Sequence, residues 1–313
     1  MVHIVEGPLY ASIQEPLPAE VNSYLYEELA YSPVNAQWSD ARKNLAWDGV
    51  RRFYNKDKQS FRSGFVDRVV FILKEVFDSD STVIRNFPEL EEHPQANHFL
   101  SLLRDPEDPS QPLSLRPYQN RLADAIIQHP RIVIWAVPRS GKTITIAAVI
   151  ARIGFVPSLF LCSDTDILSQ TAKVFQTVFS RCSEVQVGIA GNGELRRGNI
   201  MVCTRQTLAS VFGEKWSRAA HETKERDIER TEDREWLRNF VVEADFEVID
   251  EVHEVPGSAV YRNLLRKSRR VRRVAGISGT AFSNYGADLL LEGAVGRIYP
   301  EGVVDYEELI DAG

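Results

Sequence analysis

Short apolar runs alternate with helical stretches across residues 113–313. Six of these runs predict buried strands, because each is short, apolar and bounded by polar or turn-forming residues. Strands that alternate with helices are typical of a mostly parallel sheet covered on both faces. The predicted strands are residues 131–137, 158–163, 185–191, 199–204, 246–250 and 274–278.

Residues 1–104 follow a different pattern, in which short extended stretches mix with helices. This mixture predicts a small α+β domain in front of the α/β domain. Its predicted elements are strands at 3–7 and 9–14, a helix at 18–31 with Pro18 at its start, two strands around a polar turn within 46–61, and a helix at 62–77.

The predicted linker between the two domains is the stretch DPEDPSQP at residues 105–112. It carries three prolines and three acidic residues with almost nothing apolar. The sequence therefore predicts domains at 1–104 and 113–313. Within the second domain, residues 214–238 carry 15 charged residues of both signs, and we interpret this stretch as a solvated helical insertion.

Composition supports a globular protein of two domains. The chain has 313 residues, of which 43% are hydrophobic and 26% are charged. No leader is visible, and the apolar runs are shorter than the roughly 18 residues of a membrane helix. The three cysteines are scattered, so neither a disulfide framework nor a zinc site is predicted. We expect a reducing, cytoplasmic setting without a membrane partner.

The formal net charge is −7, but the charge is unevenly distributed. Residues 42–74 contain nine basic and three acidic residues, and acidic stretches flank them on both sides. A local basic stripe matters more for phosphate contact than the whole-chain sum. The candidate phosphate contacts in this stripe are Arg51, Arg52, Lys56, Lys58 and Arg62.

Three aromatic residues interleave with the basic stripe: Trp47, Phe53 and Tyr54. They could stack on exposed bases while the basic side chains grip phosphates. Alternatively, the aromatic residues belong to the core and the basic residues are merely solvated. Both interpretations remain open for this stretch.

The stretch AVPRSGKT at residues 136–143 follows a predicted strand and precedes a predicted helix. In a phosphate-binding loop of this kind, successive backbone N–H groups point at phosphate oxygens. Lys142 would reach the β- and γ-phosphates, and the Thr143 hydroxyl would hold Mg²⁺. The other predicted contacts of the loop with nucleotide are Pro138, Arg139, Ser140 and Gly141.

The strand FEVID ends in two acidic residues, Asp250 and Glu251. Carboxylates at the carboxyl end of a strand lie where ligands bind in such sheets. Asp250 would hold Mg²⁺ through water, and Glu251 would orient and deprotonate the attacking water. Together with the loop they supply the parts of phosphoryl transfer, so Lys142, Asp250 and Glu251 are the predicted catalytic residues.

These motifs resemble the first motor lobe of superfamily 2 helicases. The DEVH box at 250–253 lies between AVPRSGKT and GISGTAF, as it does in that family. The family accepts Ala136 at the start of the loop, and Arg139 replaces its third glycine. The resemblance implies a RecA-like fold, ATP and Mg²⁺ as cofactors, and DNA as the partner, with RNA still open.

The resemblance also assigns roles outside the two main motifs. The stretch LRPYQ resembles the adenine-reading segment, and Ser163-Asp164 replaces the family's Pro-Thr in CSDTDILSQT. The implied adenine contacts are Arg116 and Gln119; the implied coupling residues are His253, Ser278, Gly279 and Thr280; the implied contacts with nucleic acid are Thr165, Gln170, Thr204, Gln206 and Thr207.

Residues 44–75 resemble, over a shorter stretch, the N-terminal domain of phage UvsW-type helicases. Such enzymes remodel branched DNA in recombination, repair and replication restart, which implies a phage protein acting in a bacterial host. Nothing in the chain matches the family's second motor lobe with its arginine fingers. Residues 306–313 resemble the connector before that lobe, so we expect a partner lobe in cis or in trans.

Two alternatives to this interpretation remain. One is another helicase branch with a DEVH box, such as a repair helicase or the translocase subunit of a restriction enzyme. The other is a non-catalytic nucleic-acid-binding module that uses ATP as a switch. The basic stretch at 262–273 faces nucleic acid, the partner lobe or solvent in these interpretations.

Overall fold

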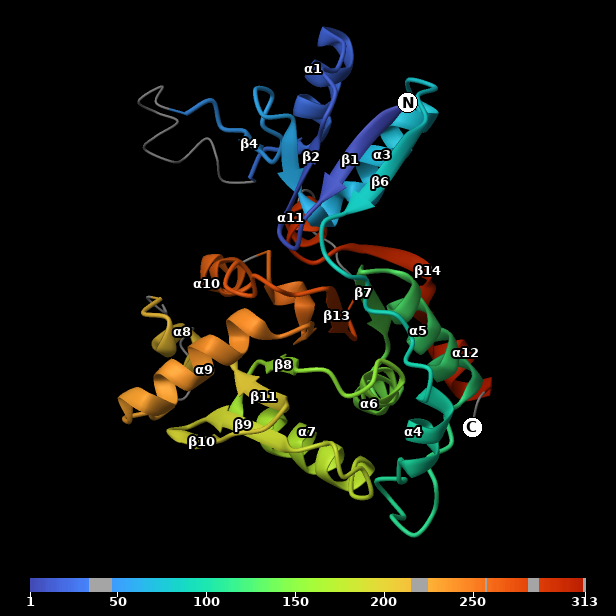
Figure 1. Cartoon of the computed structure of the whole chain (residues 1–313), viewed down its shortest axis with the longest axis vertical. Helices are drawn as coiled ribbons and strands as arrows, with labels where there is room; N and C mark the ends of the chain where they lie inside the picture. The colour runs from blue at the N-terminus through green and yellow to red at the C-terminus, as the bar shows by residue number, and fades with distance from the viewer. Residues whose placement is uncertain (34–46, 215–224, 257, 281–286, 312–313) are drawn as a thin grey trace. The chain divides into compact units, whose positions relative to one another are not determined.

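The computed structural model describes residues 1–33, 47–214, 225–256, 258–280 and 287–311 (Figure 1). The chain divides into two compact units, each made of two chain segments. Unit 1 comprises Met1–Pro88 and Phe282–Arg297, and unit 2 comprises Glu89–Ala281 and Ile298–Gly313.

Unit 1 contains a four-stranded sheet with the strand order β5-β2-β1-β6. β1 pairs antiparallel with β2 and parallel with β6, and β2 pairs antiparallel with β5. A separate two-stranded sheet joins β3 and β4. The strands are β1 (Val2–Glu6), β2 (Tyr10–Ile13), β3 (Ala30–Tyr31), β4 (Arg51–Arg52), β5 (Ser60–Arg62) and β6 (Ser81–Arg85).

The helices of unit 1 are α1 (Ala19–Glu28), η2 (Ser63–Phe65), α3 (Val66–Glu75) and α11 (Ala287–Ala294). α3 turns Val69 and Leu73 inward at helical spacing, and both are fully buried with Phe65. α11 packs on η2 so closely that a Cβ at Gly64 would lie 1.9 Å from the Glu292 carbonyl oxygen. Arg68 adds an ion pair with Glu292 at 2.6 Å.

Unit 2 is built on an eight-stranded sheet with the order β10-β9-β11-β8-β12-β13-β7-β14. The pairs from β9 to β7 are all parallel, whereas β10 runs antiparallel to β9. The strands are β7 (Arg131–Ala136), β8 (Ser158–Cys162), β9 (Val187–Gly191), β10 (Glu194–Arg196), β11 (Ile200–Thr204), β12 (Phe246–Asp250), β13 (Arg273–Ser278) and β14 (Arg297–Val304).

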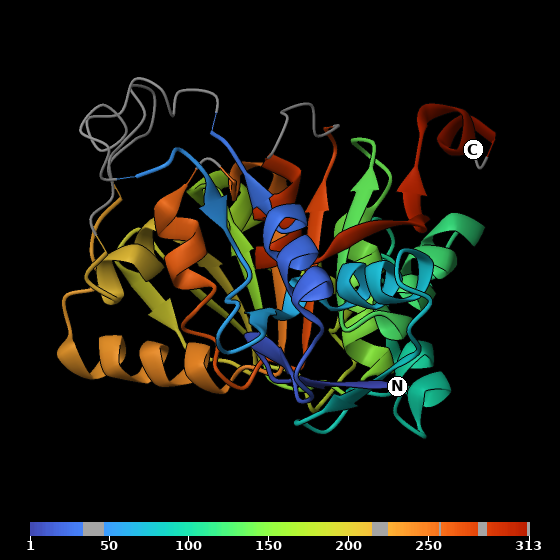
Figure 2. The same cartoon turned by 90° about the horizontal axis from the view of Figure 1, so that it is seen from above.

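Helices cover both faces of this sheet, as expected for parallel strands that are mostly apolar (Figures 1 and 2). α4, α5, α6 and α7 pack together on one face, while α8 contacts α9 and α10 on the other. The helices are α4 (Ala96–Leu102), α5 (Pro117–Gln128), α6 (Lys142–Arg152), α7 (Thr165–Val178), α8 (Arg205–Val211), α9 (Thr231–Glu243), η3 (Val252–Glu254), α10 (Ala259–Leu264) and α12 (Tyr306–Asp311).

The predicted α/β class and the mostly parallel sheet are confirmed. All six predicted strands are present, as β7, β8, β9, β11, β12 and β13. β10 and β14 add to them. The predicted pair of strands within 46–61 is corrected, since β4 pairs with β3 and β5 pairs with β2.

The contacts divide the chain at a different place from the predicted linker at 105–112. α4 packs on α6, and the Arg104 backbone N–H donates to the Val178 carbonyl at 2.9 Å, so the residues just before the linker belong to unit 2. Residues 215–224 of the predicted insertion lie outside the described residues. α9 begins at Thr231 inside the insertion, as predicted for a helical stretch, and among residues 231–238 only Leu237 is buried.

Candidate functional site

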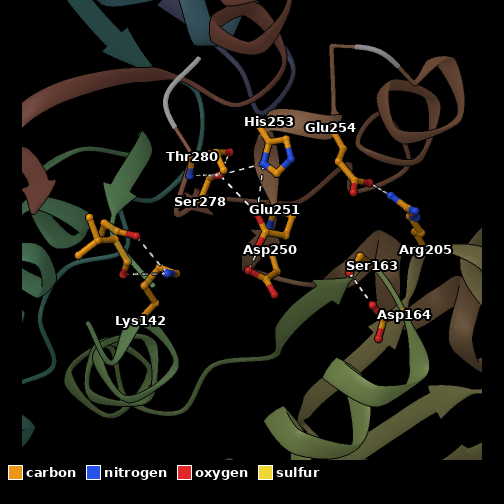
Figure 3. A network of polar contacts seen from close by, with 12 residues as sticks. Lys142, Ser163, Asp164, Arg205, Asp250, Glu251, His253, Glu254, Ser278 and Thr280 are labelled. Atoms are coloured by element: carbon orange, nitrogen blue, oxygen red, sulfur yellow. Dashed lines mark hydrogen bonds and ion pairs between the residues drawn. The ribbon is translucent and has the colours of Figure 1, made fainter. Parts of the chain in front are cut away.

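The predicted site residues of unit 2 converge at the carboxyl edge of its sheet. The phosphate-binding loop follows β7, Asp250 ends β12, and Ser278 ends β13. These three strands are neighbours in the order β12-β13-β7, so their ends meet at one edge. Figure 3 shows Lys142 on one side of the resulting space and Asp250 and Glu251 on the other.

The loop before α6 turns sharply at two residues in the left-handed region. Arg139 has φ 68° and Gly141 has φ 75°. Arg139 therefore takes a backbone conformation that favours glycine, at the place where the helicase family has one. A Cβ at Gly141 would lie 2.3 Å from the Gln119 amide nitrogen, so any other residue there would have to displace this amide.

Lys142 folds back onto the loop that it follows. Its Nζ donates to the carbonyl oxygens of Ala136 at 3.0 Å and Val137 at 3.3 Å. Burial lowers the pKa of Lys142, while the nearby charges of Asp250 and Glu251 oppose that change. An anion with better acceptors than two carbonyls would draw this ammonium group away from the loop.

Gln119 ties the segment LRPYQ to the loop. Its carbonyl oxygen accepts from the Arg116 backbone N–H at 2.9 Å, and its amide donates to the Ser140 carbonyl at 3.1 Å. The side chain is buried, so it positions the loop. Its predicted contact with an adenine edge stays a prediction.

Asp250 and Glu251 occupy different environments at the end of β12. Burial, followed by the charge of Glu251, raises the pKa of Asp250 to about 6. Glu251 has φ 48°, which turns the chain abruptly out of the strand. The Glu251 backbone N–H donates to the Asp250 carboxylate at 3.0 Å.

A polar network joins Glu251 to the end of β13. His253 Nδ1 lies 3.1 Å from the Glu251 carboxylate and 2.9 Å from the Ser278 hydroxyl. Ser278 also contacts the Glu251 carboxylate at 3.4 Å and the Thr280 hydroxyl at 3.2 Å (Figure 3). The structure thus brings together the predicted coupling residues, whose role stays a prediction.

Gly279 places this network beside the phosphate-binding loop. A Cβ at Gly279 would lie 3.2 Å from Cδ of Pro138. The loop after β13 and the loop after β7 are therefore in van der Waals contact. A shift of the Gly279 loop toward the Pro138 loop would therefore displace Pro138.

The residues present fit a nucleotide with its metal ion. Ser140 is fully buried, and its hydroxyl has no hydrogen-bond partner among the described residues, as expected of a donor meant for a ligand. The described residues contain no group of three or more His, Cys, Asp or Glu able to hold a metal. Mg²⁺ does not need such a cage, because phosphate oxygens and water complete its shell around one or two protein ligands.

The segment after β8 differs from the expectation for nucleic-acid contact. Asp164 caps α7 by accepting from the backbone N–H groups of Asp166 and Ile167, both at 3.0 Å. This cap gives the acid a structural role. Thr165 is half-buried and Gln170 is exposed on α7.

Thr204 and Thr207 lie at the end of β11 and in α8, and both are buried. Their hydroxyls donate to the carboxylate of Glu225, at 2.6 Å and 3.0 Å. Gln206 between them is half-buried. In this structure the hydroxyls of Thr204 and Thr207 therefore contact an acidic side chain. Their contact with nucleic acid stays a prediction.

Three basic side chains of the stripe in unit 1 lie over the rings of two tyrosines. Arg52 lies over the Tyr26 ring at 4.8 Å and Lys56 at 4.3 Å, whereas Arg62 lies over Tyr10 at 5.9 Å. Arg51 and Lys58 are exposed.

The aromatic residues of the stripe are mostly core. Tyr54 is 3% exposed, and Phe53 stacks on Tyr31 and packs on Phe65. The interpretation that Tyr54 stacks on bases is therefore wrong, because its side chain is buried, whereas Phe53 is half-buried against two other aromatic rings of unit 1. Trp47 is half-buried and donates to the Val50 carbonyl at 2.9 Å.

Sequence reasoning missed two acidic partners in unit 2. Arg205, which opens α8, forms an ion pair with Glu254 beside the DEVH box (Figure 3). Glu225 contacts Thr204 and Thr207. Neither pair leaves a local signal, since the partners lie far apart in the sequence and charged residues surround Glu225.

Fold and site together define a RecA-like α/β domain with a phosphate-binding loop. A family model described as "Type III restriction enzyme, res subunit" matches residues 112–282, more than half of the chain. The chain belongs to this family. No curated protein matches it.

Two solved structures of the UvsW helicase from bacteriophage T4 share the fold. The first has 12% identity and a TM-score of 0.69, and the match covers 95% of this chain and 99% of that one. The second has 12% identity and a TM-score of 0.68, covering 95% of this chain but 56% of that one. The predicted likeness to UvsW-type helicases is thus confirmed for the fold. In the described residues, no helix is long and apolar enough to cross a membrane.

Proposed function

We propose that this chain is the first motor lobe and N-terminal domain of an ATP-dependent DNA helicase or translocase that remodels branched DNA in recombination, repair or replication restart. The observation that carries the proposal is the contact network from Glu251 through His253 to Ser278, facing Lys142. ATP hydrolysis requires a cradle for the phosphates and a group that positions the attacking water, and the phosphate-binding loop and the Glu251 carboxylate would supply these two parts.

Each residue of the site has a role in this proposal. Lys142 Nζ leaves its two carbonyl partners in the loop and donates to phosphate oxygens instead. Glu251 takes the proton of the attacking water, and His253 fixes the orientation of its carboxylate. Thr143 and Asp250 would hold Mg²⁺, which neutralises charge on the phosphates.

DNA contact in the proposal comes from both units. Arg51, Lys56 and Lys58 of unit 1 would bind backbone phosphates. Thr204 and Thr207 of unit 2 would bind the translocated strand. A second motor lobe, in cis or in trans, would supply the arginine fingers, so we expect this chain alone to bind ATP and turn it over slowly.

One alternative has a specific observation in its favour. The matching family is described as the res subunit of a type III restriction enzyme, and the alternative is a translocase subunit of that kind. Stimulation by forked DNA over a linear duplex of equal length would support remodelling of branches. Equal stimulation would favour the restriction-type translocase.

The proposal is tested by ATP turnover and by binding of a fluorescent ATP analogue, with and without forked DNA. We expect Lys142→Ala to abolish binding of the analogue and Glu251→Gln to retain it. Turnover should fall by about 10²-fold or more in Glu251→Gln, because a general base is lost. Lys173→Ala, on the exposed surface of α7, is the matched control.

If Lys142→Ala binds the analogue like the unaltered chain, the proposal is wrong. DNA affinity that does not depend on nucleotide would remove the coupling on which a motor depends.

A further inference from the structure

The carboxylate of Glu225 occupies a small site built from three donors. Its Oε2 accepts from the hydroxyls of Thr204 and Thr207, at 2.6 Å and 3.0 Å, and from the Asn192 backbone N–H at 3.4 Å. The donors come from the end of β11, from α8 and from the turn between β9 and β10. Donors from three parts of unit 2 thus meet around one oxygen atom.

The backbone next to Glu225 packs against the turn between β9 and β10. Asn192 and Gly193 both have positive φ, 51° and 82°, which shapes a tight hairpin turn. The Arg226 backbone N–H donates to the Asn192 side-chain oxygen at 3.3 Å. A Cβ at Gly193 would lie 3.0 Å from Cβ of Arg226, so glycine allows this close approach.

A phosphodiester group matches the chemistry that these donors offer. Like a carboxylate, it carries one negative charge on two oxygens that accept hydrogen bonds from hydroxyl and backbone N–H groups. Thr204 and Thr207 are the residues expected to contact the nucleic-acid backbone. A carboxylate and a backbone phosphate cannot both occupy this place.

We propose that Glu225 is an internal competitor of nucleic acid: its carboxylate fills an oxyanion site at Asn192, Thr204 and Thr207 and must leave before a backbone phosphate can bind there. The inference rests on the proposed function and adds a residue that sets the affinity of this site for DNA.

The site satisfies only one of the two oxygens of the Glu225 carboxylate, which allows the carboxylate to be exchanged for another anion. Its second carboxylate oxygen, Oε1, is buried and has no hydrogen-bond partner among the described residues. A buried acceptor without a partner is costly, so the carboxylate gains less here than in a fully satisfied site. Arg226 and Asp227 are exposed, and Ile228 is the next buried side chain, so Glu225 can leave without disturbing the core.

The competing explanation is that Glu225 only satisfies two buried hydroxyls. Removing it would then lower stability and leave DNA affinity changed by net charge alone. Glu229 separates these explanations, because it is an exposed acid of the same segment, four residues further on. Glu225→Ala and Glu229→Ala remove the same charge, but only the first empties the oxyanion site.

The experiment measures affinity of the full chain for a labelled oligothymidylate by fluorescence anisotropy. We expect Glu225→Ala to bind roughly three- to tenfold more tightly than Glu229→Ala, since removing one competing contact contributes about 1 kcal/mol. Glu225→Gln, which keeps the size of the side chain, should fall between them and covers the case that Glu225→Ala does not fold. Thr207→Val should weaken binding more in the Glu225→Ala background than alone.

Two contrary results are distinguishable. Equal affinities of Glu225→Ala, Glu225→Gln and Glu229→Ala would overturn the inference and leave the proposed function intact. Absence of nucleic-acid binding by the unaltered chain and by every variant would overturn both.

Discussion

At the scale of single residues, Gly141 shows how a loop conformation and a neighbouring side chain depend on each other. Two features favour glycine at position 141: the φ of 75°, and the Gln119 amide that occupies the space a side chain would take. Gln119 in turn fixes the Ser140 carbonyl at 3.1 Å. The direction of the loop N–H groups therefore depends on a side chain from α5.

We predict that Gly141→Ala weakens nucleotide binding and destabilises the fold by more than the strain of a left-handed alanine, which is about 1–2 kcal/mol. Gly213→Ala is the matched control, because Gly213 has φ 71° but nothing within 4 Å of an added Cβ. Urea unfolding and binding of an ATP analogue would measure both effects. Equal destabilisation in the two variants would show that Gln119 yields without loss.

At the scale of elements, β12 combines a buried strand with a titratable group. Glu247 is the second residue of β12 and is 2% exposed. Burial raises the pKa of Glu247 to about 7, although the charge of Arg131 opposes the change. The folded chain therefore binds more protons than the unfolded chain between the ordinary pKa of 4.5 and about 7.

It follows that Glu247 favours the folded chain at low pH and that this contribution is lost as pH rises through about 7. We predict that Glu247→Gln raises the free energy of unfolding at pH 8 by roughly 3 kcal/mol, since one pKa unit corresponds to about 1.4 kcal/mol. Little gain is expected near pH 4.5. Urea unfolding at both pH values checks this.

Glu243→Gln is the control for Glu247→Gln, because Glu243 forms an exposed ion pair with Arg270 near the same strand. Exposed pairs contribute roughly 0–1 kcal/mol, so its effect should be small at both pH values. A gain for Glu247→Gln that does not depend on pH would show that Glu247 is not the titrating group.

Elements also show which parts of the fold could be predicted. β8 and β12 are short, mostly apolar runs, so the sequence alone located them. β14 could not be recognised, because it contains Pro300 and Gly302 and alternates poorly. Its place beside β7 depends on tertiary pairing.

The candidate site was predictable where chemistry follows a strand. Lys142, Asp250 and Glu251 come directly after strands or open a helix, so their meeting at one edge follows from a parallel sheet. Glu225 was not predictable, since its partners are hydroxyls brought by two other elements. The ion pair of Arg205 and Glu254 depends likewise on packing.

At the scale of the whole molecule, unit 1 is discontinuous in sequence. Its last helix, α11, follows β13 and precedes β14, both strands of unit 2. The close approach of Gly64 and the ion pair between Arg68 and Glu292 bind α11 within unit 1. A cut at Pro88 therefore removes part of the core of unit 1.

We predict that residues 1–88 alone do not unfold cooperatively, because the buried ring of Phe65 loses the cover of α11. Joining residues 282–297 through a glycine-serine linker should restore a cooperative urea transition. The same fusion carrying Gly64→Ala is the control and should fail, since a Cβ there would lie 1.9 Å from the Glu292 carbonyl oxygen. A sharp transition for residues 1–88 alone would contradict the prediction.

The discontinuity of unit 1 also has a consequence for the order of events on the ribosome. Residues 1–88 leave the exit tunnel first, yet their partner helix ends only at Ala294. At about 5–20 residues per second, roughly 10 to 40 s pass before α11 is translated. During that interval the surface around Phe65 lacks the cover of α11, and unit 1 completes its fold only after residues 89–281 have been synthesised.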